Sequence, residues 1–242
     1  MRHCYALLSG GLDSTLAILA IVSKNEPVEM SPVFFDYGQK AREEESRAVR
    51  QLVPIFRKRT KHPESRVHDC RFFNIAGSDQ GLFSWSQSAI LTSRPHDGDV
   101  DLENRNMVLL SCVASIFMAD RKASQVGQSA ELVTGFLNEH YDTRLPFVSA
   151  FEDLFEAMGQ QIKVTAPLIP QDRGARRVSR DHLVHLAHSL DAYSLLKDNT
   201  WSCYYPQLGK PCECCPACGK RADFFQELGM KKVKNKPRRP LS

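Results

Sequence analysis

The chain has 242 residues, of which 42% are hydrophobic and 25% charged, and a formal net charge of +4. This length is enough for one α/β domain with a substantial core, or for one domain with a small satellite. No apolar run reaches the roughly 18 residues that a membrane span needs, and the first eight residues lead into a glycine-rich loop without the apolar stretch of a signal peptide. The sequence therefore predicts no membrane partner and favours a cytoplasmic location.

The pattern of apolar and polar residues predicts strands that alternate with helices. In chain order we expect a strand at residues 5–8, a helix from Asp13, a strand at 31–35, a charged helix at 40–61, a strand at 66–73, a long loop at 74–103, a helix at 106–120, a strand at 131–136, a helix at 149–161, an extended segment at 164–169 and a helix that is capped by Ser179 and ends near residue 189. This order predicts an α/β fold, with an open parallel sheet and helices on both of its faces.

A glycine-rich loop, Ser9-Gly10-Gly11-Leu12-Asp13-Ser14-Thr15, joins the first predicted strand to the first predicted helix. Glycines let the backbone approach an anion, and the start of a helix offers unpaired amides at the positive end of its dipole. The hydroxyl groups add donors, and Asp13 could hold Mg²⁺ or orient a nucleotide. On this chemistry alone two interpretations stay open: a phosphate-binding loop, or a tight turn with an Asp or Ser helix cap.

Five of the eight cysteines are clustered between residues 203 and 218, a pattern that points to a metal rather than to disulfides. Cys203, Cys212, Cys215 and Cys218 have the spacing C-x8-C-x2-C-x2-C, which suits a closed, structural Zn²⁺ site. Cys214 breaks the three-residue rhythm and is left outside the predicted set. The alternatives are disulfides, loose thiols or a nucleic-acid zinc module. No aromatic platform for a nucleic acid lies nearby, so we expect no direct nucleic-acid contact.

Positive charge is concentrated at residues 231–239. Such a run predicts a solvated, flexible tail, or else an electrostatic arm for an acidic partner.

The complete string from Ser9 to Ser14 resembles the SGGxDS signature of the PP-loop ATP pyrophosphatases, and it has the same place after the first strand. The chain contains no G-x4-G-K-[ST] P-loop and no G-x-G-x-x-G dinucleotide motif. The resemblance implies that the residues of the loop, from Ser9 to Thr15, bind the pyrophosphate of ATP, and that the enzyme transfers AMP to a carboxyl or carbonyl oxygen.

Five segments, spread in the expected order over almost the whole chain, resemble the 7-cyano-7-deazaguanine synthase (QueC) family. They are the SGGLDS loop, residues 35–39, Arg105-Asn106 before an apolar helix, residues 133–135, and residues 200–204 with the three later cysteines and Arg221. The resemblance implies a deazaguanine carboxylate as substrate, ATP and Mg²⁺ as co-substrates, a structural Zn²⁺ and a homodimer. In that family the carboxylate is adenylated, ammonia gives an amide, and a further ATP-driven dehydration gives the nitrile.

The resemblance also assigns roles to individual residues. Asp13, Ser14, Arg105 and Arg180 are the expected catalytic residues, and Asp36 and Gly135 join the ATP site. Asp36 ends a strand, where open parallel sheets bind ligands, although it could equally cap the turn. The expected substrate-binding residues are Tyr37, Gln39, Asn106, Tyr141, Asp142 and Arg144. The chain then divides into an ATP-binding adenylation domain (1–198), a zinc segment (199–229) and a basic tail (230–242).

The match is uneven on the side that should hold the base or admit ammonia. A valine-proline-glycine step before Arg105 and an acidic segment ending in tyrosine-proline-aspartate after Gly135 are both missing, and Arg180 or Arg173 must replace a lysine near the phosphates.

Two enzyme hypotheses follow. Either the nucleophile is ammonia and the product is the nitrile, or the chain is an antiviral-defence enzyme that couples the activated deazaguanine to the N-terminal amine of a partner protein encoded nearby. The hypothesis from another class is a non-catalytic nucleotide sensor or zinc-bearing binding module, against which the retained Asp13 and Ser14 speak.

Overall fold

The structure is a computed structural model that describes residues 1–76, 105–123, 129–139, 141–170 and 177–234. Nearly all of the predicted loop at 74–103, the alternative phosphate ligand Arg173 and the basic tail from residue 235 onward lie outside these residues.

Within the described residues the central sheet is entirely parallel. Its strands are β1 (Arg2–Leu7), β2 (Val28–Asp36), β3 (Arg66–Val67), β4 (Arg71–Asn74), β5 (Ser129–Val133) and β6 (Gln161–Thr165). They are ordered β3-β2-β1-β5-β6, and β4 pairs with the second half of β2. The order reverses between β1 and β5, and open parallel sheets bind ligands at such a switch point, outside the carboxyl ends of the strands. The predicted open parallel α/β sheet is confirmed.

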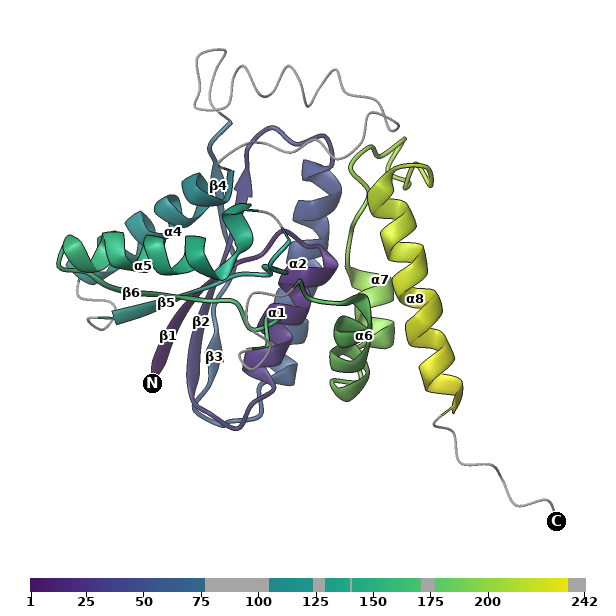
Figure 1. Ribbon diagram of the computed structural model, residues 1–242, viewed down its shortest axis with the longest axis horizontal. Helices are drawn as coiled ribbons and strands as arrows, with labels where there is room; N and C mark the ends of the chain where they lie inside the picture. The colour runs from purple at the N-terminus through teal and green to yellow at the C-terminus, as the bar shows by residue number, and fades with distance from the viewer. Residues whose placement is uncertain (77–104, 124–128, 140, 171–176, 235–242) are drawn as a thin grey trace.

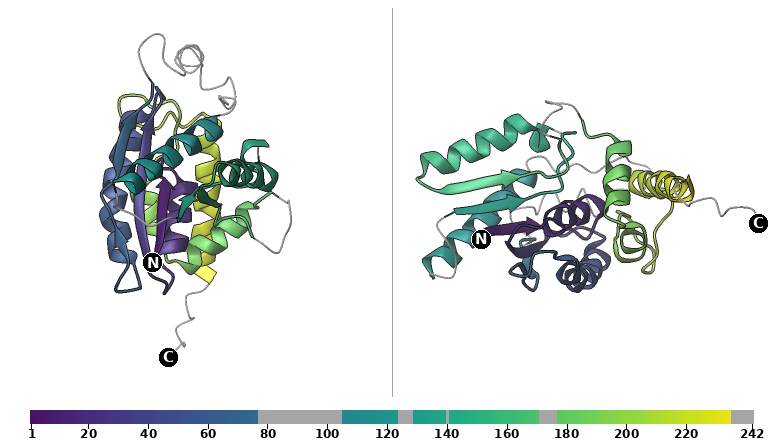
Figure 2. Two further views of the ribbon diagram at one scale, coloured as in Figure 1. Left: turned by 90° about the vertical axis from the view of Figure 1, so that its left-hand side faces the viewer. Right: turned by 90° about the horizontal axis from the view of Figure 1, so that it is seen from below.

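The helices cover both faces of the sheet. On one face lie α1 (Leu12–Val22) and α2 (Arg42–Arg59), and on the other lie α4 (Arg105–Lys122) and α5 (Leu145–Ala157), which follows a short 3₁₀ turn, η1 (Tyr141–Thr143) (Figure 2). Outside α1 and α2 pack α6 (Arg180–Ser189), α7 (Tyr193–Asn199) and α8 (Pro216–Lys234) (Figure 1). Among the described helices, none combines the length and the apolar character needed to cross a bilayer.

The core surrounds β1, the middle strand of the sheet. Tyr5 and Ala6 of β1 are almost completely buried, as are Leu16 and Ile18 of α1. The ring of Tyr5 meets that of Phe117 on α4 edge to face, with centroids 5.8 Å apart. Because β1 is covered by helices on both faces, the sequence has a continuous apolar run at residues 4–8.

Several predicted elements have different bounds in the structure. The helix expected at 149–161 lies at Leu145–Ala157, and Gln161 begins β6 instead. Ile162 and Val164 alternate there with exposed neighbours, which is the pattern of an edge strand and not of a helix. The strand expected at 66–73 is split into β3 and β4, and α7 and α8 are absent from the prediction. The cap at Ser179 is confirmed, because its hydroxyl accepts a hydrogen bond from the His182 amide at 3.2 Å.

Candidate active site

The glycine-rich loop lies at the carboxyl end of β1. Gly10 has a φ of +79°, a left-handed conformation that favours glycine, and a Cβ there would lie only 2.8 Å from the carbonyl oxygen of Glu45. Gly11 is the N-cap of α1 and has no side chain that could occupy the amides of the first turn. The hydroxyl oxygens of Ser9 and Ser14 lie 3.1 Å apart. The loop therefore combines hydroxyl groups with the positive end of a helix, which suits a phosphate.

Gly135, which follows β5, touches this loop at very close range. A Cβ at Gly135 would lie 2.6 Å from the amide nitrogen of Ser14 and 2.8 Å from the carbonyl carbon of Asp13. These distances are shorter than any ordinary carbon contact, so a larger residue would have to move the backbone. Glycine at this position is what lets the ends of β1 and β5 meet at the switch point.

A cavity of about 770 Å³ adjoins the loop, a size suited to a small-molecule site. It is bounded by the ends of β1, β2 and β5, by the start of α4, and by α6 and α8. The predicted site residues that line it are Ser9, Gly11, Leu12, Asp13, Ser14, Tyr37, Gln39, Arg105, Asn106, Gly135, Asp142 and Arg180.

The remaining predicted ligand residues do not line the cavity. Gly10 is buried against α2, and Thr15 is fully buried, with its hydroxyl donating to the Gly11 carbonyl at 2.7 Å. The carboxylate of Asp36 accepts from the Gly38 amide at 2.9 Å and so caps the turn after β2. Tyr141, the first residue of η1, and Arg144, which follows η1, are exposed.

The start of α4 connects the two sides of the substrate half of the cavity. The guanidinium of Arg105 lies 5.9 Å from the ring centroid of Tyr37. The next residue, Asn106, donates from its side-chain amide to the carboxylate of Asp142 at 2.9 Å. Asp142 is buried, whereas Tyr141 and Arg144, the two other residues predicted in this substrate segment, are exposed. The structure thus brings Asp142 to Asn106 and leaves Tyr141 and Arg144 outside.

Three charged groups meet beside the glycine-rich loop. Burial raises the pKa of Asp13 to about 6; the negative charge of Glu139 adds to this rise, and the positive charge of Lys220 opposes it. Glu139 is also paired with Arg177 at 2.7 Å. Glu139 and Lys220 both line the cavity, but neither was predicted from the sequence as a site residue.

A second carboxylate with unusual acidity lies on the α2 side of the cavity. Gln39 accepts from the Tyr37 amide at 2.9 Å, and its side-chain nitrogen donates to the Phe35 carbonyl at 3.1 Å and to the Glu45 carboxylate at 2.9 Å. Burial raises the pKa of Glu45 to about 7, although the Gln39 hydrogen bond and the charge of Arg105 favour its ionised form. Gln39 therefore fixes Glu45 at the cavity wall. Glu45 gave no signal in the sequence, because it stands in a run of charges on a helix.

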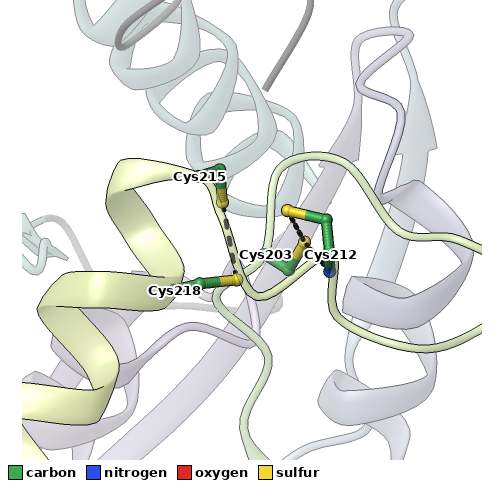
Figure 3. A group of neighbouring side chains, drawn as sticks. All are labelled: Cys203, Cys212, Cys215 and Cys218. Carbon is green, nitrogen blue, oxygen red and sulfur yellow. Dashed lines mark hydrogen bonds between the residues drawn. The ribbon is translucent and has the colours of Figure 1, made fainter. Parts of the chain in front are cut away.

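The four predicted metal ligands lie together in the C-terminal segment (Figure 3). Their sulfur atoms all lie within 4.8 Å of one another; Cys203 and Cys212 are 3.5 Å apart, and so are Cys215 and Cys218. Cys214 is exposed and outside the group, as predicted. Four sulfurs at this spacing fit a tetrahedral Zn²⁺ site.

This cysteine cluster is tied directly to the glycine-rich loop. The Trp201 amide donates to the Gly10 carbonyl at 2.9 Å, and the Trp201 indole donates to the Cys203 carbonyl at 2.7 Å. Arg221, on α8, donates to the Thr200 hydroxyl at 2.7 Å. The C-terminal segment thereby forms one wall of the cavity.

Comparisons with known proteins agree with this geometry. The family model "Queuosine biosynthesis protein QueC" matches residues 3–229. A 7-cyano-7-deazaguanine synthase of Methanosarcina barkeri is 30% identical over 239 residues, which cover 93% of this chain and 94% of that protein. One of Acetivibrio thermocellus is 28% identical over 240 residues, covering 95% and 96%. A solved 4-thiouridine synthetase–RNA complex with bound ATP has a TM-score of 0.43 at 15% identity, covering 96% of this chain and 53% of that one, a likeness too weak to support an inference. On the family match, which spans nearly the whole sequence, the chain belongs to the QueC family.

Proposed function

We propose that this chain is an ATP-dependent carbon–nitrogen ligase of the 7-cyano-7-deazaguanine synthase type, which forms AMP and pyrophosphate. It adenylates the carboxylate of 7-carboxy-7-deazaguanine, passes the acyl group to ammonia, and dehydrates the amide to 7-cyano-7-deazaguanine with further ATP. The observation that carries the proposal is the shared cavity, whose wall joins the glycine-rich loop to the Tyr37–Gln39 turn and to Arg105. Nucleotide phosphates and a second ligand can therefore meet in one space. The names of the curated relatives support the substrate class.

The loop would hold the pyrophosphate portion of ATP through its amides and the hydroxyl groups of Ser9 and Ser14. Asp13 and Glu139 offer carboxylate oxygens, which are the ligands that Mg²⁺ prefers, so the donor set on this wall fits that ion. Bound there, Mg²⁺ would neutralise phosphate charge. The cysteine cluster fits Zn²⁺, which would hold the C-terminal segment together.

In the first step an oxygen of the substrate carboxylate attacks the α-phosphorus, and pyrophosphate leaves with the electron pair of the broken bond. The amine nitrogen then attacks the acyl carbon, and AMP leaves. In this proposal Arg105 binds the substrate carboxylate or the developing phosphate charge, and Tyr37, Gln39 and Asn106 orient the base. Positioning and charge stabilisation are what a protein contributes to such a transfer.

A second acceptor is consistent with the altered substrate segment. Of the three residues expected there, only Asp142 lines the cavity. The first half of the reaction needs no change if the N-terminal amine of a partner protein takes the place of ammonia.

One experiment separates these outcomes. The purified protein is incubated with ATP, Mg²⁺ and 7-carboxy-7-deazaguanine, with and without ammonium, and the products are identified by mass spectrometry. An amide and a nitrile support the proposed synthase. A polypeptide carrying the deazaguanine, formed when the protein encoded nearby is added, supports the second acceptor. Bound ATP that is never split to AMP would overturn the ligase in favour of a nucleotide sensor.

Asp13→Asn should abolish AMP formation. Asp69→Asn is the matched control, since Asp69 is an exposed carboxylate that pairs with Arg57 and lies away from the cavity.

A further inference from the structure

The cavity wall beside the glycine-rich loop carries negative charge of its own. Asp13 and Glu139 both line it, and they are close enough for the charge of Glu139 to raise the pKa of Asp13. A bound triphosphate adds several more negative charges in a partly desolvated space, where like charges repel strongly. A cationic side chain on this wall would offset this repulsion together with the proposed Mg²⁺.

The guanidinium groups of two arginines of the same wall make their contacts with α7 and α8. Arg180, which the sequence suggested as the phosphate cation, pairs with Asp223 at 3.1 Å and with Glu227 at 3.0 Å, both on α8. Arg221 donates to the Thr200 hydroxyl at 2.7 Å and, at 2.8 Å, to a backbone carbonyl at the end of α7. These contacts direct both guanidinium groups toward α7 and α8.

The charge of Lys220, by contrast, acts on the glycine-rich loop itself. This residue stands in the second turn of α8 and lines the cavity, and its positive charge acts on Asp13 at the start of α1. Lys220 and the glycine-rich loop therefore face the same cavity, in which the phosphate oxygens would lie. Lysine is a compact point charge on a flexible stem, which suits binding to a phosphate.

The cysteine cluster fixes both sides of this arrangement. α8 begins at Pro216, between Cys215 and Cys218, so these two cysteines set the direction in which the helix leaves the cluster. On the other side, Trp201 joins the segment before Cys203 to the loop through the Gly10 carbonyl. The segment that carries the four sulfurs therefore contacts the loop at one end and continues into α8 at the other.

We propose that Lys220 binds the pyrophosphate portion of ATP and that the cysteine cluster sets the position of its ammonium group. The proposal rests on the adenylation proposed above. In that step the bond between the carboxylate oxygen and the α-phosphorus forms while the bond from the α-phosphorus to the bridging oxygen breaks, and the electron pair leaves on pyrophosphate. Lys220 stabilises the charge that develops there.

The test uses the full-length, zinc-loaded protein. Binding of Mg²⁺–pyrophosphate, ATP and AMP is measured by calorimetry for the wild type, Lys220→Gln, Lys220→Arg and Lys210→Gln. Lys210 is the matched control, because it is an exposed lysine of the same segment that does not line the cavity. Lys220→Gln should weaken pyrophosphate and ATP about 10-fold to 100-fold, leave AMP binding unchanged and keep its zinc. Lys220→Arg should recover part of the loss, and Lys210→Gln should match the wild type.

Equal pyrophosphate affinity for Lys220→Gln and the wild type would overturn the proposal, and so would an equal loss for pyrophosphate and AMP. Protein that has been depleted of zinc and then freed of the chelator should bind Mg²⁺–pyrophosphate more weakly than the zinc-loaded wild type, and depletion should cost Lys220→Gln less affinity than it costs the wild type. If the wild type keeps its affinity, the cluster does not position Lys220. The wild type could also bind pyrophosphate through Lys220 and yet form no AMP. That result would support this inference and overturn the proposed ligase.

Discussion

Gly135→Ala tests the close contact on which the candidate ATP site depends. The added Cβ would start 2.6 Å from the Ser14 amide nitrogen, and ordinary contact begins at 3.4 Å. The ends of β5 and α1 must therefore separate by roughly 0.8 Å, because the groups in contact are backbone and cannot rotate away. Overpacking of this kind costs about 1–3 kcal/mol, which lowers the melting temperature of a chain of this size by about 2–12 °C.

The larger effect is expected on catalysis. A displacement near 1 Å in a site that works by positioning costs about 100-fold in rate, so kcat/KM for ATP should fall by about that factor. The assay is AMP formation at varied ATP concentration, with thermal unfolding measured in parallel. Gly229→Ala is the matched control, since its Cβ would meet Tyr193 no closer than 3.9 Å. A Gly135→Ala protein with wild-type kcat/KM would refute the argument that this contact positions the loop.

Three further predictions concern groups around the core and the site. Folding favours the protonated form of Glu45, because burial raises its pKa from 4.5 to about 7. The stability that this carboxyl group contributes is present below pH 4.5 and is lost as the pH rises through about 7. In denaturant titrations the wild type should therefore lose about 3 kcal/mol relative to Glu45→Gln over this window, and parallel curves of stability against pH for the two proteins would contradict this. In the zinc site proposed for the cysteine cluster, Cys203→Ser should abolish zinc binding and lower the melting temperature by about 10 °C. Cys214→Ser should change neither the metal content nor the melting temperature. Equal metal content in both variants would argue against the assigned ligands. Asp120→Asn should cost about 1–2 kcal/mol of stability, because Arg71 donates to both oxygens of this carboxylate at 3.0 and 2.7 Å. The affinity for ATP should stay unchanged, since neither residue lines the cavity. A loss of ATP affinity measured by calorimetry would instead show that this ion pair is coupled to the site over a longer range.

Elements whose signal lies in neighbouring residues could be predicted from the sequence. The bounds of a strand at the edge of the sheet could not, because they depend on pairing with a distant strand. The apolar run of β1 and the glycines that follow it predict a buried strand and a turn from only a few residues. The N-cap at Ser179 is likewise a local hydrogen bond. The start of β6 was misplaced, because Ile162 and Val164 are too few to outweigh the helical pattern before them, and the pairing with β5 decides the strand.

By itself, the sequence determined the parallel α/β fold, the glycine-rich loop and the set of four cysteines. Each of these can be predicted from the spacing of residues that are close together in the chain, within a strand, a turn or a cysteine knuckle. Only the tertiary structure decided which charged groups face that loop. Glu45, Glu139 and Lys220 come from α2, from the segment after β5 and from α8, and each looks like an ordinary surface charge in the sequence. Their effects on one another arise from burial at a common wall, which depends on how distant elements pack. For the same reason Asp142 reaches the cavity while Tyr141 and Arg144, beside it in the chain, remain on the surface.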